Sequence, residues 1–183
     1  MVRRALDTLY SVSGAIAALF IVGIAGIVFA QVGLNLADKI VSSITGRALG
    51  LTIPSYSDFT GFFLAAASFL ALACTLRAGG HIRVMLIVGT LPKPMQSLFE
   101  GLALAIGALM TGYSAWYMVL LVLESYEFGD MSSGMVSMPL WIPQTPVALG
   151  LIVLTIALTD ELAGVLRGRA PTYEGKGENL LNE

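Results

Sequence analysis

Few residues of this chain have side chains that could carry catalytic or metal-binding chemistry. The sequence holds one cysteine, Cys74, and one histidine, His81. A disulfide within the chain, a haem held by two of its own histidines and a metal site of several histidines are therefore excluded. The acidic residue nearest to an apolar interior is Glu100, which stands in the first turn of an expected helix, where the helix dipole favours a carboxylate. No catalytic motif is present, so we predict that the protein is not an enzyme.

Charged residues are missing from four long segments of the chain, 8–37, 59–76, 101–123 and 131–159. Hydrophobic residues make up 56% of the 183 residues and charged residues 12%. A helix of about 20 apolar residues crosses the roughly 30 Å hydrocarbon core of a bilayer. We therefore predict an all-α integral membrane protein, with one domain over residues 1–183. Its four transmembrane helices are expected at about 9–33, 56–76, 95–123 and 140–158, with a polar tail at 167–183.

Short interfacial helices are expected in the connections. Apolar residues from Leu34 to Ala48 repeat at helical spacing, which predicts an amphipathic helix lying on the membrane surface. The mostly apolar run from His81 to Val88 is too short to span and is expected to lie in the interface. Small-residue pairs such as Gly14/Ala18 and Gly26/Ala30 favour close helix packing.

The basic residues are distributed unequally between the two sides of the predicted membrane. With four spans, the termini and the middle connection share one side, which has eight of the ten Lys and Arg residues; Lys39 and Arg47 are on the other. Basic residues near span ends stay in the cytoplasm. We predict that both termini are cytoplasmic. Arg77, at the cytoplasmic end of the second span, is expected to reach water or lipid phosphate.

Polar residues inside the spans are mostly hydroxyls, and we expect these to bond to their own helix backbone: Ser13, Ser68, Thr75, Thr111, Ser114 and Thr155. No acidic or basic residue lies near the centre of a span, where such residues mark ion or proton pathways. The sequence therefore argues against an autonomous transport site. No basic stripe suited to nucleic acid is present either.

Two motifs resemble a known family. The first reads Arg77-Ala78-Gly79-Gly80-His81-Ile82-Arg83-Val84, followed by Leu91-Pro92. The second reads Ser137-Met138-Pro139-Leu140-Trp141-Ile142-Pro143, followed by Pro146 and Gly150. With four spans and this length, the chain resembles the small membrane subunit of tripartite ATP-independent periplasmic (TRAP) transporters. The family often has an acidic residue where this chain has Met85.

The resemblance implies a bacterial inner-membrane protein that works with two partners. In that family a soluble periplasmic protein captures the solute, and a large membrane subunit carries the solute and sodium sites. The small subunit is similar to a fixed brace, so no cofactor is expected on this chain. Candidate structural or partner-interface residues lie in the two motifs: Arg77, Gly80, His81, Arg83, Pro139, Trp141 and Pro146.

The connection after the third span has three acidic residues and no basic one: Glu124, Glu127 and Asp130. Charges of one sign can steer a complementary partner, so these residues are candidates for docking the periplasmic protein. Two other functions stay open from the sequence alone. One is a membrane anchor of a respiratory or redox enzyme, and the other is a small self-assembling transporter or channel.

Overall fold

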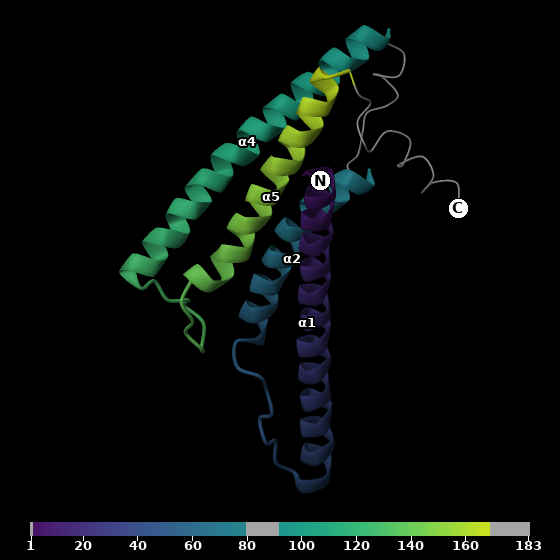
Figure 1. Ribbon diagram of the computed structural model, residues 1–183. Helices are drawn as coiled ribbons and strands as arrows, with labels where there is room; N and C mark the ends of the chain where they lie inside the picture. The colour runs from purple at the N-terminus through teal and green to yellow at the C-terminus, as the bar shows by residue number, and fades with distance from the viewer. Residues whose placement is uncertain (1, 80–91, 169–183) are drawn as a thin grey trace, which may run out of the picture.

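Four long helices account for most of the structure, which is a computed structural model that describes residues 2–79 and 92–168 (Figure 1). They are α1 (Val2–Thr45), α2 (Tyr56–Ala78), α4 (Lys93–Phe128) and α5 (Trp141–Leu166). Each helix is long and apolar enough to cross a membrane. The predicted all-α architecture with four transmembrane-length helices is confirmed. The interfacial segment expected at 81–88 and most of the tail lie outside the described residues.

The first helix is much longer than the span predicted for it. It has 44 residues, which at 1.5 Å per residue makes it about 66 Å long. Residues 34–45 are helical, as their spacing predicted, but they continue α1 along its axis and do not form a separate helix on the membrane surface (Figure 1). No Gly or Pro interrupts residues 34–45, and the helix ends before Gly46, where φ is 70°.

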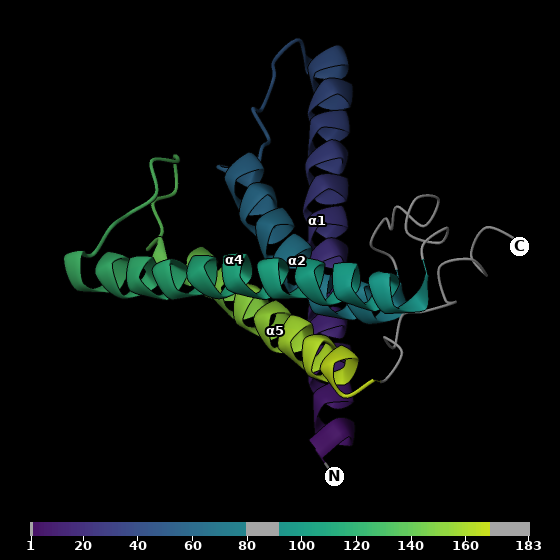
Figure 2. The ribbon, with the colours of Figure 1, turned by 90° about the horizontal axis from the view of Figure 1, so that it is seen from above.

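The helices form two antiparallel hairpins that pack against each other. In the first hairpin α1 packs on α2, and in the second α4 packs on α5. The two hairpins are joined mainly by α2 against α5, so α1 and α4 lie on the outside (Figure 1). Seen from above, α4 runs across the direction of α1 (Figure 2). The result is an open row of helices in the order α1, α2, α5, α4. A closed bundle would have buried the outer faces of α1 and α4.

The buried core lies near one end of this row, where residues of all four helices converge. Its central side chains are small or aliphatic, with one aromatic residue from α1: Tyr10, Ala73, Leu76, Leu104, Ala108, Val153, Leu154, Ala157 and Leu158. Away from this end the two hairpins diverge (Figure 1). The chain therefore has a packed end, where α2 finishes, and an open end, where α2 begins.

Small residues set several of the helix contacts. A Cβ added to Gly14 would come within 2.9 Å of the Cys74 sulfur, so α1 and α2 are in close contact there. On the other hairpin, a Cβ added to Gly112 would meet the Thr155 side chain at 3.4 Å. By contrast, nothing lies within 4 Å of the Cβ position of Gly26. The predicted packing role is thus confirmed for Gly14 and absent for Gly26 among the described residues.

Candidate functional site

A cluster of charged residues joins three helices at the packed end. Arg77, in the last turn of α2, forms an ion pair with Asp7 of α1. Its other terminal nitrogen lies 3.4 Å from Asp160 Oδ2 and 4.0 Å from Glu161 Oε1, both of α5. The planar guanidinium has several donors in a fixed fork, which suits it to hold carboxylates on two sides at once. We call these four residues the Arg77 cluster.

The Arg77 cluster is only partly open to solvent. The Glu161 side chain is 4% exposed and that of Arg77 18%, whereas Asp7 is 47% exposed. The guanidinium carbon also lies 5.2 Å from the ring centre of buried Tyr10, a distance typical of a cation–π contact. Removing one partner of a buried ion pair leaves a charge that water cannot solvate well. The cluster therefore fixes the ends of α1, α2 and α5 relative to one another.

The expectation that Arg77 reaches water or lipid phosphate is wrong. Its side chain turns toward the acidic residues of its own chain instead. Sequence reasoning missed Asp7, Tyr10, Asp160 and Glu161 because each lies far from Arg77 in the chain. One signal was available, because Asp7 and Asp160 directly border two of the uncharged segments at the same predicted membrane level.

Four of the six hydroxyl groups predicted to bond to their own helix do so, and Ser13 does not. Thr75, Thr111, Ser114 and Thr155 each donate to a carbonyl three or four residues earlier in the same helix. Ser13 instead donates across the helix boundary, to the Leu70 carbonyl of α2, with 2.6 Å between the oxygens. This buried hydrogen bond joins α1 to α2 close to the contact between Gly14 and Cys74.

At the open end, the connection between α1 and α2 is held along α1 by two polar side chains. Gln31, which is buried, accepts from the Ile53 backbone N–H at 2.8 Å and donates to the Thr52 hydroxyl at 3.0 Å. Seven residues further along, Asp38 Oδ1 accepts the backbone N–H groups of Leu49 and Gly50. Gln31 was not singled out from the sequence, although it is an amide within an uncharged apolar segment.

The connection between α4 and α5 folds back on itself. Met131 and Pro139 form an isolated antiparallel bridge. Beside it, the Ser132 N–H donates to the Met138 carbonyl at 2.9 Å, and the Leu140 N–H donates to the Asp130 carbonyl at 2.9 Å. We call residues 129–140 the 129–140 loop. These bonds give it a defined shape at the open end of the helices.

The 129–140 loop is also attached to the beginning of α2. The Val136 N–H donates to the Ser55 hydroxyl at 3.0 Å. Gly134 lies so close to α2 that an added Cβ would meet the Asp58 carboxylate. Ser55 itself has φ 56°, an uncommon left-handed conformation for a residue other than glycine. The loop after α4 thus contacts the turn before α2 and links the two hairpins at the open end.

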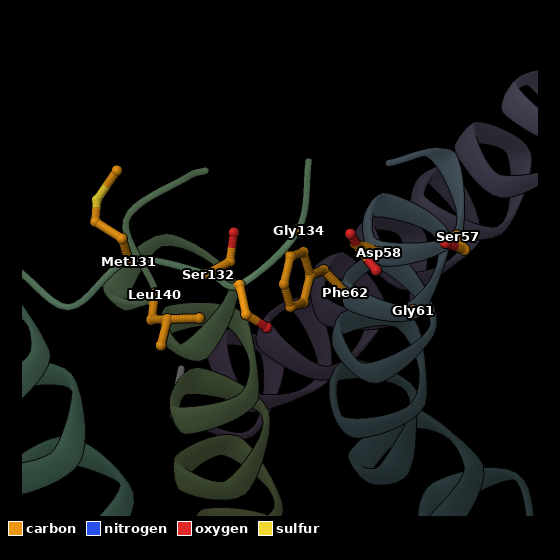
Figure 3. Close-up of a pocket in the computed structure, with 9 residues that line it drawn as sticks. Ser57, Asp58, Gly61, Phe62, Met131, Ser132, Gly134 and Leu140 are labelled. Carbon is orange, nitrogen blue, oxygen red and sulfur yellow. The ribbon is translucent and has the colours of Figure 1, made fainter. Parts of the chain in front are cut away.

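An open hollow of about 570 Å³ lies between the start of α2 and the 129–140 loop (Figure 3). Asp58 and Phe62 extend from α2 toward the loop, and Met131 and Leu140 line the opposite side. The lining combines a carboxylate and hydroxyls with apolar side chains. Within the described residues no group of three or more His, Cys, Asp or Glu side chains could hold a metal ion.

The predicted site residues fall into separate places. Pro139 belongs to the bridge in the loop, and Trp141, the first residue of α5, has its ring 5.7 Å from that of Tyr126 of α4. Pro146 lies inside α5, half-buried. These three are at the open end, far along α2 from Arg77. Gly80, His81 and Arg83 lie outside the described residues.

The three docking candidates are exposed and lie near one another in the chain. Glu124 and Glu127 are on the last turns of α4, and Asp130 follows the Gly129 cap. The Asp130 backbone anchors the loop through Leu140, while its side chain is exposed. Partner contact by these residues stays a prediction.

The sequence comparisons agree with this membrane architecture. No curated protein matches the chain. A family model matches residues 36–168, and its description is the DctQ component of tripartite ATP-independent periplasmic transporters. The matched part runs from the end of α1 through all of α2, α4 and α5, and includes the hollow and most of the Arg77 cluster. The chain is therefore a multi-pass membrane protein that belongs to the DctQ family, the small membrane subunits of TRAP transporters.

Proposed function

We propose that this subunit is a non-catalytic scaffold in a secondary, ion-gradient-driven solute transporter. It braces the large membrane subunit and helps to receive the solute-loaded periplasmic protein. The solute and the coupling sodium ions bind to the other components. The protein resides in the bacterial inner membrane with both termini in the cytoplasm.

The open row of helices carries this proposal. In a protein that worked alone, packing would be expected to close around a central site, yet here the outer helices α1 and α4 each pack mainly on one neighbour. Large apolar side chains on α4, such as Leu109 and Met110, are left exposed. A brace needs such free lateral faces, because it adds width to a partner in the membrane.

The distribution of charge agrees with a scaffold. The described ion pairs lie at the packed end of the helices, not at their centres, and they join helices of the same chain. Ionisable groups at membrane depth are costly and usually serve transport or proton transfer. The Arg77 cluster instead serves to hold α1, α2 and α5 together.

The open end is proposed to face the periplasm. This follows from the eight-to-two distribution of basic residues, which puts the Arg77 cluster at the cytoplasmic side. The 129–140 loop, the hollow and the exposed acidic residues then form the surface on which the periplasmic protein docks.

Reconstitution tests the proposal directly. Proteoliposomes would contain the large subunit with or without this chain, and periplasmic protein with solute would be added outside under a sodium gradient. We expect uptake only when both membrane subunits are present, and none with this chain alone. Solute uptake by this chain alone would contradict the scaffold role.

The family membership does not favour the alternative function, a membrane anchor of a redox enzyme.

A further inference from the structure

A line of large apolar side chains runs along α1 on the side away from α2. Its members are all exposed, with Phe29 83% and Ile44 79% exposed, and they are spaced by three, four or seven residues: Val22, Phe29, Val32, Leu36, Ile40 and Ile44. Such spacing places side chains on one side of a helix. We call this line the α1 stripe.

We infer that the α1 stripe is a docking surface for a helix of a second membrane-embedded chain. The inference rests on the proposed function, in which that chain is the large transport subunit. It goes further by assigning the contact to one face of one helix, including a part of that helix that lies outside the bilayer.

The opposite side of α1 is already occupied by this chain. Gln31 and Asp38, seven residues apart, hold the returning segment 49–53 through backbone hydrogen bonds. An amphipathic helix on a lipid surface would use its polar side for headgroups and water. Here that side holds the chain's own loop, and the apolar side is the exposed one.

The alignment of α1 with α2 in the first hairpin shows which part of the α1 stripe lies at the depth of the lipid. Lipid can cover only that part. The Gly23 backbone lies against the Phe63 ring, and Gln31 bonds to Ile53, so the start of α2 at Tyr56 is level with about residue 30 of α1. With 23 residues, α2 is about 34 Å long. It can cross a hydrocarbon core of roughly 30 Å only if it tilts by no more than about 30°.

The end of α1 must therefore stand outside the hydrocarbon. For α1 at the same 30° tilt, Ile40 and Ile44 lie about 13 and 18 Å beyond the level of residue 30, from the rise of 1.5 Å per residue. The headgroup layer is only about 5–8 Å thick on each side. Lipid cannot shield these two aliphatic side chains, and a row of exposed apolar residues in water marks a protein contact.

The α1 stripe runs without a break from inside the membrane to the region outside it. This restricts the kind of partner that can cover it. Val22 lies within the membrane, level with Phe63 of α2, whereas Ile44 lies well outside it. A partner that covers both must itself be embedded in the membrane and rise above it. The stripe has no charged member, which is typical of permanent interfaces. Nothing lies within 4 Å of the Cβ positions of Gly26 and Gly33 beside it, so another helix can approach closely.

Photo-crosslinking in the assembled transporter tests the inference. A benzophenone amino acid would replace Ile40 or Ile44 in the full-length chain, which would be expressed with the large subunit and the periplasmic protein and irradiated in native membranes. Ser42, on the opposite side of the same helix, is the matched control. We expect an adduct with the large subunit from positions 40 and 44 and none from position 42.

A substitution experiment measures the strength of the contact. The double variant Ile40→Asp, Ile44→Asp should lower the amount of large subunit that co-purifies by about tenfold or more, as loss of central interface residues does. Ser42→Asp should leave it unchanged. Equal amounts of each variant in the membrane would show that the chain still folds.

The outcomes separate this inference from the proposed function. If the unmodified chain does not co-purify with a large membrane subunit, the proposed function fails. If it co-purifies but positions 40 and 44 give no adduct with that subunit, only the α1 stripe inference fails. Adducts from these positions solely with lipid, with the periplasmic protein or with a second copy of this chain would also overturn it.

Discussion

Gly150 of α5 lies directly against the backbone of Phe69 in α2. A Cβ added to Gly150 would come within 2.5 Å of the Phe69 carbonyl carbon and 2.6 Å of its oxygen. Backbone atoms cannot move aside as the end of a flexible side chain can. This contact sets the distance between the two hairpins, so the packing of the whole chain depends on the absence of a side chain at one position.

Gly150→Ala should therefore destabilise the protein. Overpacking of a tight contact costs about 1–3 kcal/mol, which outweighs the gain of up to about 1 kcal/mol from replacing glycine in a helix. Gly164→Ala in the same helix is the matched control, because nothing lies within 4 Å of its Cβ position. Thermal unfolding in detergent should show a lower midpoint for Gly150→Ala and an equal or higher one for Gly164→Ala. Equal midpoints for the two variants would contradict the close contact.

Arg77→Gln should loosen the packed end. The change leaves Glu161, which is 4% exposed, without the guanidinium that lies 4.0 Å away. The expected loss lies between the value of about 1 kcal/mol or less for surface pairs and the 3–5 kcal/mol typical of buried ones, because Arg77 is intermediate in exposure. Denaturant unfolding of the purified protein measures it.

A second substitution separates charge from packing at this site. If the loss comes from the charge of Glu161 once the guanidinium is removed, adding Glu161→Gln to Arg77→Gln should restore part of the stability. Asp7→Asn, at a half-exposed position, should cost much less than Arg77→Gln. Additive losses in the double variant would mean that Arg77 and Glu161 are not coupled.

Gln31→Leu should release the segment that returns from the end of α1. The Ile53 N–H would lose its acceptor, Gln31 Oε1, and the Thr52 hydroxyl would lose a donor. Hydrogen exchange at the Ile53 amide should become faster, because a broken bond exposes the amide to water. Gln31→Glu is the informative control, since a carboxylate still accepts from Ile53. Unchanged exchange in Gln31→Leu would mean that other contacts hold the segment.

Cysteine labelling in intact cells should report the proposed orientation. In cells that express this chain without the large subunit, single cysteines at Ser43, on the outer part of α1, and at Ser133, in the 129–140 loop, should react with an impermeant reagent, because both residues are exposed. A cysteine at Thr90, in the connection between α2 and α4, should react only after the cells are opened. Labelling at Thr90 alone in intact cells would reverse the orientation.

Conversion of Glu127 and Asp130 to lysine should slow solute uptake at low salt and limiting periplasmic protein. Both residues are exposed, and separated charges raise the association rate of a complementary partner. The defect should shrink as ionic strength rises, because salt screens the charges. Equal uptake by variant and parent at low salt, with equal amounts of assembled complex, would exclude a docking role for these residues.

The sequence predicted the helices well and their arrangement poorly. Runs without charge located all four helices, because a membrane helix is defined by local composition. The start of α2 at Tyr56 was predicted correctly, since Pro54 and the polar residues around it interrupt the pattern. The end of α1 was not, because the helix continues through Gly33, where the span was expected to stop, and ends only at Thr45.

The sequence placed Arg77, Asp7 and Asp160 at the same predicted membrane level but could not show that they pair. Pairing of Arg77 with Asp7 and Asp160 depends on which helices are neighbours, and nothing local to any of the three residues specifies that. The same holds for Gly150, whose contact with Phe69 is a property of two helices. For Gln31, an amide in an apolar segment was a visible signal, but its partner Ile53 depends on the path of the returning loop.

The pairing of helices that are adjacent in the chain also bears on how the protein is made. The contact of α1 with α2 can form once α2 has left the ribosome, and that of α4 with α5 can form the same way at the end of synthesis. The α2–α5 contact at Gly150 must wait for the last helix. Assembly in the membrane can thus proceed as two hairpins that insert in turn and then dock side by side. A first hairpin that did not dock would leave the α5-binding face of α2 uncovered. Membrane proteases would then degrade the unassembled chain.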